Sequence, residues 1–180
     1  MAWRWPDCPC HKRPSSPTTA SELLGLEGKC AVAYFRAWNT IAIKWKGLNQ
    51  HPISDEWLGY ASRSALRSRK TARNIRATHP INAMLNYAYG MLEVQTRINI
   101  ITQGYDPTKG IIHGDKYNNR QTFVFDKMEP ARPLVDRRIL ALIKDNTFSP
   151  SDFPINAAGT CRLNPELARV VAGCVNNATL

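Results

Sequence analysis

One segment, residues 78–104, is regular enough to require a long amphipathic helix. It reads THPINAMLNYAYGMLEVQTRINIITQG, and its apolar residues recur at steps of three and four, from Ile81 through Ala88 to Ile98. This spacing gathers them on one face of an α-helix. Pro80 suits the first helical turn, where an N–H would be unpaired anyway, and Gly104 suits the C-terminal stop. A chain with this segment needs other elements that cover its apolar face.

Three further segments have the helical spacing. Residues 18–45 predict a long helix that Thr19 or Ser21 can cap, and residues 132–148 and 164–175 predict two amphipathic helices. The segment 48–63 is expected to be a loop that leads into another helix through the basic residues after it.

The β signals are short. IIHGD and RQTFVFD favour strands and GDKYNNR joins them as a polar connection, which predicts a minor β-hairpin over residues 111–126. The fold class is therefore expected to be mainly α. Residues 1–19, with four prolines, are expected to form an irregular leader, and residues 20–180 one helical domain.

Composition excludes some classes of protein. With 43% apolar and 21% charged residues the chain is not expected to be disordered. No stretch approaches the roughly 18–20 consecutive apolar residues of a membrane span, and the first residues lack the apolar core of a signal peptide. Five cysteines at scattered spacing favour a reducing compartment, so a cytoplasmic, prokaryotic location is expected. Cys8, Cys10 and His11 could begin a zinc site, but no second ligand pair follows at suitable spacing.

The net charge of +10 is concentrated in the first 80 residues, which hold 13 Lys and Arg against five Asp and Glu. The densest stretch is RSALRSRKTARNIR, residues 63–76, which contains no acid. A surface of this kind attracts a polyanion, most simply a nucleic-acid backbone. A solvated basic helix face with no particular partner would give the same pattern.

Four side chains could carry chemistry. Glu27 shares a predicted helical face with Leu23, Cys30 and Tyr34, and a carboxylate is costly to bury there unless it is paired or binds a metal. A salt bridge to an arginine is the alternative.

His113 ends a short apolar run, and Asp126 and Glu129 lie three residues apart, which places both carboxylates on one face of a helix. The alternatives are a histidine that only forms hydrogen bonds and a helix capping box. Together, the imidazole and the carboxylates could bind Mg²⁺ or Mn²⁺.

Several segments, in order along the chain, resemble one known family. GLEGKCAVAYFRAW is similar to the motif G-x-E-G-x-x-A-x-x-Y-F of the CRISPR-associated integrases of spacer acquisition, the Cas-one endonucleases. HPINAMLNYAYGMLE resembles that family's helix N-P-V-N-A-L-L-N-Y-G-Y, and ITQGYDPTKGIIH resembles A-G-L-D-P-x-x-G-x-L-H. NRQTFVFDKMEPARPLVDR is similar to G-R-x-S-L-x-x-D-L-M-E-E-F-R-P-x-V-D-R, and NPELARVV matches a late helix more weakly.

The resemblance implies a helical catalytic lobe. By motif it assigns the metal ligands to Glu27, His113 and Glu129, with Asp126 as an adjacent catalytic acid and Mg²⁺ or Mn²⁺ as the ion. It implies that a 3′-hydroxyl of a captured DNA fragment attacks a phosphodiester at the edge of a repeat array, and that metal-dependent DNA cleavage is a related activity. The implied partners are double-stranded or branched DNA, the small Cas-two protein and a second copy of the chain. The expected DNA contacts are Arg63, Arg67, Arg69, Lys70, Arg73, Arg120 and Arg132.

The chain departs from the family pattern in three places. Relative to that pattern, the helical domain of residues 20–180 is expected to be truncated at its C-terminus. The family's β-rich N-terminal domain is expected to be absent, because only the short leader precedes the Glu27 motif. Pro130 and Ala131 replace the family's E-F, and a proline disfavours helical geometry at the residue before it, here Glu129, although it is tolerated in a first helical turn. A catalytically silent DNA-binding remnant and a transposon-encoded integrase of the same superfamily are the alternatives.

Overall fold

The computed structural model describes residues 19–61, 78–112, 121–157 and 159–176, apart from the side chains of Ala20, Leu24 and Glu27. The predicted leader, the basic segment of residues 63–76 and His113 lie wholly or almost wholly outside these ranges. In chain order the elements are α1 (Ala20–Arg36), the 3-10 turn η2 (Ala37–Thr40), β1 (Lys44–Trp45), the 3-10 turn η3 (Asp55–Trp57), α2 (Pro80–Thr102), α3 (Thr122–Met128), the 3-10 turn η5 (Glu129–Ala131), α4 (Arg132–Asp145), β2 (Thr147–Phe148), the 3-10 turn η6 (Pro150–Asp152) and α5 (Pro165–Asn176).

The mainly helical fold class is confirmed. The predicted β-hairpin is wrong, because the strands among the described residues are β1 and β2, which are parallel and pair Lys44 with Thr147 and Trp45 with Phe148. RQTFVFD, expected as a strand, contains most of helix α3. Its β-branched and aromatic residues favour a strand only weakly when tertiary packing opposes it. Here Thr122, Val124 and Met128 are buried on one side of the helix.

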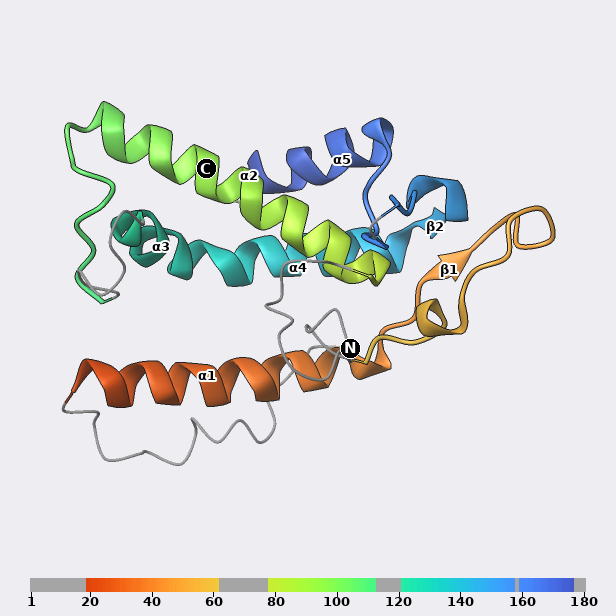
Figure 1. Ribbon diagram of the computed structural model, residues 1–180, viewed down its shortest axis with the longest axis horizontal. Coiled ribbons are helices and arrows are strands. Elements are labelled where there is room, and N and C mark those ends of the chain that lie inside the picture. The colour runs from red at the N-terminus through yellow and green to blue at the C-terminus, as the bar shows by residue number, and fades with distance from the viewer. Residues whose placement is uncertain (1–18, 62–77, 113–120, 158, 177–180) are drawn as a thin grey trace.

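Helix α2 is the centre of the structure. It crosses between α5 on one side and α3 and α4 on the other, as Figure 1 shows. Ile81, Met84, Leu85 and Leu92 on its inner face are completely buried, and each contributes roughly 1.5–3 kcal/mol relative to an exposed side chain. The predicted ends hold: Pro80 is in the first turn, and Gly104 has φ +79°, a left-handed conformation that glycine adopts without strain.

Helix α1 differs from the other long helices. The expected helix over residues 18–45 ends at Arg36 and continues as η2, after which the chain enters β1. Thr19, one of the two predicted caps, accepts a hydrogen bond from the Glu22 amide at 3.2 Å. Near the C-terminal end of α1, Tyr34 and Phe35 are partly buried against the hydrophobic core, and the helix lies along one edge of the molecule (Figure 1). Its position therefore depends on a small number of contacts near its C-terminal end.

Pro130 does not displace Glu129 from helical geometry. Glu129 has φ −52° and ψ −48°, and Pro130 lies within η5. This differs from the expected effect of a proline on the residue before it. The short 3-10 turn joins α3 to α4 without a loop, so Asp126, Glu129 and Arg132 follow one another along a nearly continuous helical path.

Candidate functional site

The loop that leads to His113 is docked on the first turn of α3. The Thr122 hydroxyl donates to the carbonyl of Thr108 at 2.6 Å and accepts a hydrogen bond from the Gly110 amide at 2.9 Å. Earlier in the loop, Asp106 accepts hydrogen bonds from both the hydroxyl and the amide of Thr108, and these bonds lower the pKa of Asp106. The side chains on both sides of the contact thus determine the path of residues 106–110.

Asp126 holds the end of the same loop. One oxygen of its carboxylate, Oδ2, accepts hydrogen bonds from the backbone amides of Ile111 and Ile112, at 2.6 and 2.8 Å. The capping-box alternative is wrong for this residue, since Asp126 lies inside α3 and Gln121 is the N-cap. His113 itself lies outside the described residues, but the two residues immediately before it are fixed by Asp126.

Glu129 lies one turn beyond Asp126 and pairs with an arginine. Its Oε1 is 2.7 Å from Nη1 of Arg132, and the Arg132 guanidinium lies 5.4 Å from the centre of the Tyr89 ring on α2. A cation over an aromatic ring is attracted by the ring's electrons. Arg132, which the sequence suggested as a DNA contact, is therefore already engaged by Glu129 and Tyr89.

Two of the three predicted metal ligands lack described side chains. Glu27 is in α1, and His113 lies outside the described residues, so the convergence of Glu27, His113 and Glu129 stays a prediction. Among the described side chains no group of three histidines, cysteines or acids is close enough together to bind an ion. The chemistry of the predicted set nevertheless fits a divalent cation, because carboxylate oxygens and one imidazole suit Mg²⁺ and Mn²⁺.

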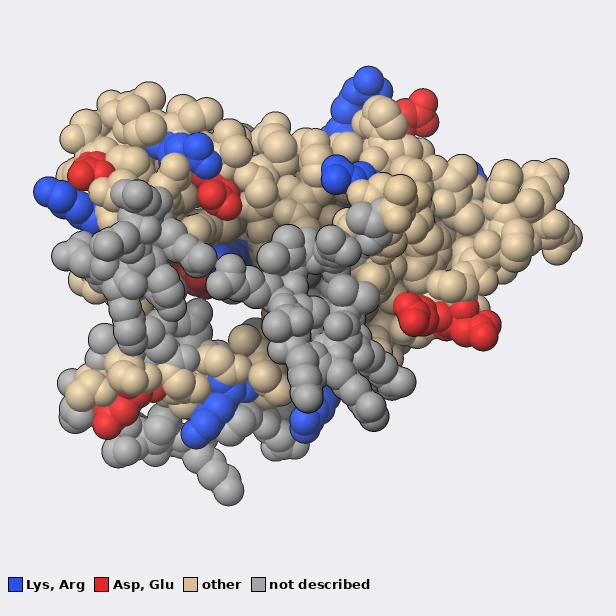
Figure 2. Space-filling view, viewed as in Figure 1, with Lys and Arg blue, Asp and Glu red and all other residues tan. Residues whose placement is uncertain are grey.

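Of the seven predicted DNA contacts, Arg132 alone lies among the described residues. Arg63, Arg67, Arg69, Lys70, Arg73 and Arg120 lie outside the described residues. On the face in Figure 2, the lysines and arginines of the described part are scattered among acidic residues and form no continuous patch. The described residues alone therefore form no basic DNA surface on this face.

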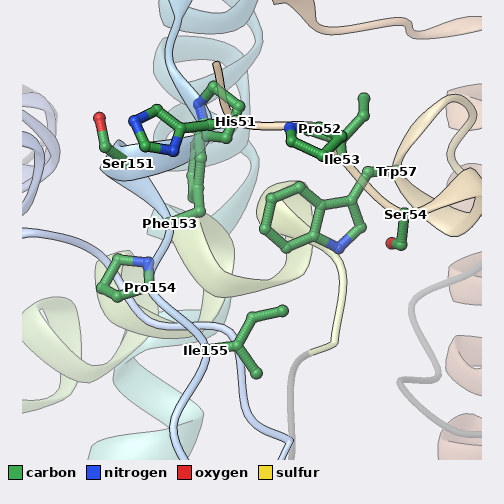
Figure 3. A pocket seen from close by; sticks show the side chains of 10 residues that line it. His51, Pro52, Ile53, Ser54, Trp57, Ser151, Phe153, Pro154 and Ile155 are labelled. Carbon is green, nitrogen blue, oxygen red and sulfur yellow. The ribbon is translucent and has the colours of Figure 1, made fainter. Parts of the chain in front are cut away.

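A pocket of about 310 Å³ lies far from these residues, between the loop at 51–57 and the segment at 150–155. Figure 3 shows Trp57 and Phe153 beside it; their rings meet edge to face with centres 6.1 Å apart. His51 is the one titratable residue of its lining. Since α3 lies at the opposite end of the molecule (Figure 1), this pocket is separate from Asp126 and Glu129.

Sequence reasoning did not identify a buried acid in α4. Asp136 is 3% exposed and accepts a hydrogen bond from the Tyr89 hydroxyl at 2.5 Å. The available signal was its position between Val135 and Ile139, on the buried face of an amphipathic helix. A carboxylate at such a position needs hydrogen-bond partners.

Comparison with known protein families gives a match over almost the whole chain. The family model described as CRISPR associated protein Cas1 matches residues 10–177. The CRISPR-associated endonuclease Cas1 1 of Methanospirillum hungatei is 30% identical over 154 residues, which cover 85% of this chain and 40% of that protein. A Cas4/Cas1 fusion of Geobacter sulfurreducens is 31% identical over 84% of this chain and 24% of its own length. The chain thus spans less than half the length of these relatives, and it aligns with their C-terminal part.

Solved structures show the same fold. A casposase bound to integration product superimposes with a TM-score of 0.71 and 24% identity, over 91% of this chain and 43% of the casposase chain. A chain of a partial Cas6-RT-Cas1–Cas2 complex superimposes with a TM-score of 0.65 and 26% identity, over 90% of this chain and 44% of that one. None of the helices in the described part of the structure has the length and apolar character that crossing a membrane requires.

Proposed function

Because this chain belongs to the family of CRISPR-associated Cas1 proteins, we propose that it is the catalytic lobe of a metal-dependent DNA endonuclease and integrase. The reaction is the insertion of new spacers into a CRISPR repeat array. The observation that carries the proposal is the family match over residues 10–177 together with the ordered motifs around Glu27, His113 and Glu129.

In the proposed reaction the 3′-hydroxyl of a captured DNA fragment attacks a phosphodiester of the repeat. A new P–O bond forms, the existing P–O bond breaks, and the leaving strand keeps a 3′-hydroxyl. Glu27, His113 and Glu129 would hold Mg²⁺ or Mn²⁺. When bound, such an ion polarises the phosphoryl oxygen and lowers the pKa of the attacking hydroxyl.

The described residues supply two supporting arrangements. Asp126 fixes the backbone of Ile111 and Ile112 directly before His113, which would restrict where the imidazole can lie. Arg132 pairs with Glu129 and would hold its carboxylate in one orientation until the ion binds. A misplacement of about 1 Å in such a site can lower the rate about 100-fold.

Two matched structures support the proposed DNA and Cas2 partners. One matched structure is a complex that includes Cas1 and Cas2, and another is a casposase bound to integration product. We expect this chain to bind branched or double-stranded DNA, to assemble with a Cas2 protein and a second copy of itself, and to act in the cytoplasm. A repeat array and a Cas2 gene beside its own gene would favour this role, whereas flanking inverted repeats would favour a transposon integrase.

The test is strand transfer by the purified chain, with a Cas2 protein, into a plasmid that carries repeats. Labelled donor DNA with 3′-hydroxyl ends should be joined in Mn²⁺ or Mg²⁺, and neither EDTA-treated samples nor donors with 3′-dideoxy ends should react. His113→Ala should abolish joining, and the control His51→Ala, in the distant pocket, should not.

Equal activity of His113→Ala and the unchanged chain would remove this histidine from the mechanism. Salt-sensitive DNA binding with no joining and no cleavage, unaffected by EDTA or His113→Ala, would instead identify a catalytically silent DNA-binding protein.

A further inference from the structure

A buried polar network joins three helices beside the candidate site. Asp136 on α4 is at its centre. The Tyr89 hydroxyl on α2 donates to Asp136 at 2.5 Å, and the Tyr34 hydroxyl on α1 also forms a hydrogen bond with this carboxylate. Burial, and then the charge of Asp136, raises the pKa of Tyr34 well above its usual range. Tyr34 therefore stays protonated and is a permanent donor to Asp136.

The network continues to Glu129. Tyr89 makes two contacts: its hydroxyl donates a hydrogen bond to Asp136, and the Arg132 guanidinium lies over the face of its ring. Arg132 in turn pairs with Glu129. A continuous set of contacts thus connects Glu129, at the end of α3, with Tyr34 near the end of α1.

Helix α1 has few other attachments in the described structure. Its side chains Leu23 and Val32 are 40% and 61% exposed, whereas Tyr34 and Phe35, near its C-terminal end, are partly buried against the hydrophobic core. The rings of Tyr34, Phe35 and Trp38 cluster at its last turn. Contacts between apolar rings depend only weakly on their relative orientation. The Tyr34–Asp136 hydrogen bond requires a particular geometry and therefore restricts the orientation of α1.

Glu27 is carried by the same rigid helix, seven residues or about two turns before Tyr34. The intervening helix spans roughly 10 Å at 1.5 Å per residue. A small rotation of α1 about its last turn would therefore move Glu27 by a distance that matters to chemistry.

We propose that Asp136 is a positioning residue that accepts hydrogen bonds from the hydroxyls of Tyr34 and Tyr89. Through these bonds it fixes the position of α1, and therefore of Glu27, relative to Glu129. This inference rests on the proposed function, in which Glu27 and Glu129 share one site. Asp136 does not touch the substrate; it acts through the two tyrosines. Its burial, which is unfavourable for a carboxylate without partners, is offset by these two hydrogen bonds.

The experiment compares Asp136→Asn and Tyr34→Phe with the control Asp145→Asn, an exposed acid on the same helix. The first readout is amide hydrogen exchange of the peptides that cover residues 20–36, which needs no activity. Both test variants should exchange about tenfold faster there, with α5 unchanged, because the attachment of α1 is weakened. Exchange in α2 should also stay unchanged in Tyr34→Phe, because this variant keeps the Tyr89–Asp136 hydrogen bond. The control should match the unchanged chain.

The second readout is strand transfer with Cas2 under saturating DNA. Both test variants should lower kcat roughly 10- to 100-fold, as expected for a misplaced group, with KM for DNA within about twofold of the unchanged chain. The double variant Tyr34→Phe/Asp136→Asn should be no slower than the slower single variant, since both changes break the same contact, the one between Tyr34 and Asp136.

Unchanged exchange in α1, exchange that rises equally in all helices, or an unchanged kcat would each overturn the proposal. If Asp136→Asn does not fold, Tyr34→Phe decides the question, because it removes a single hydroxyl. If the unchanged chain joins no DNA, the proposed function fails, and local exchange in α1 alone then decides whether Asp136 positions this helix.

Discussion

Gly110 lies so close to Thr122 that a Cβ atom on the glycine would stand 2.7 Å from the backbone carbonyl carbon of Thr122. The Gly110 amide also donates to the Thr122 hydroxyl. The loop that leads to His113 therefore reaches α3 only because this position has no side chain.

We expect Gly110→Ala to lower the free energy of unfolding by about 1–3 kcal/mol, as overpacking usually does, since the clash is with backbone and cannot be relieved by a rotamer change. Gly90→Ala is the matched control, because nothing lies within 4 Å of a Cβ there and alanine favours α2 by up to about 1 kcal/mol. Urea denaturation of the three proteins measures both effects. Equal stability of the two variants would contradict the close approach.

Asp126→Ala should slow strand transfer about 10- to 100-fold, because the two amides before His113 lose their common acceptor. It should also lower the free energy of unfolding by roughly 1–2 kcal/mol. Asp126→Asn retains one oxygen at this position, so its strand-transfer rate and its free energy of unfolding should lie between those of Asp126→Ala and the unchanged chain. If Asp126→Ala reacts as fast as the unchanged chain, Asp126 does not position His113.

The stability of the fold should decrease as the pH falls from about 6.5 towards 4. His79, the N-cap of α2, accepts a hydrogen bond from the Ile81 amide at 3.1 Å, and burial lowers its pKa to about 4. Between these pH values the unfolded chain binds a proton that the folded chain does not, so unfolding becomes easier by up to about 3 kcal/mol.

His79→Asn keeps an acceptor at the cap and removes this titration. Denaturation curves at pH 7, 6, 5 and 4.5 should show a smaller loss of stability for the variant than for the unchanged chain. Parallel pH profiles would show that His79 is protonated as easily in the folded state as in the unfolded one.

Cys161 should react slowly with iodoacetamide in the native protein. It is 3% exposed, and burial raises its pKa to about 12, so the reactive thiolate is scarce at neutral pH. Cys30, which is partly exposed, should be labelled much faster, and urea should abolish the difference. Mass spectrometry of the labelled peptides measures both rates, and equal labelling in native buffer would contradict the burial of Cys161.

The central helix was predictable because local signals agreed with one another. Pro80 and Gly104 mark the two ends of α2. The apolar spacing between them predicted one buried face, which is correct for Ile81 and Ala88 but wrong for Ile98, whose side chain is 53% exposed. The segment from Thr122 to Phe125 was misread because its β-branched and aromatic residues favour a strand. Burial of Thr122, Val124 and Met128 made it a helix, and no short-range signal records that burial.

The sequence predicts the candidate site as a set of residues but not as an arrangement. The motifs identified Glu27, His113, Asp126 and Glu129, since each lies in a segment similar to one family pattern. Asp126 accepts hydrogen bonds from backbone amides 14 and 15 residues earlier in the chain. This structural role depends on how the loop folds back on α3. The link between Tyr34, Tyr89 and Asp136 joins positions up to 102 residues apart.

By itself the sequence determined the helical class, the ends of α2 and the family to which the chain belongs. Helix propensity, helix caps and motifs depend on residues that are close together in the sequence, so they can be recognised without the fold. Only the tertiary structure decided the pairing of β1 with β2, the helical state of residues 122–128 and the partners of Asp126 and Asp136. These depend on burial and on contacts between distant segments, which the packing of the whole chain selects.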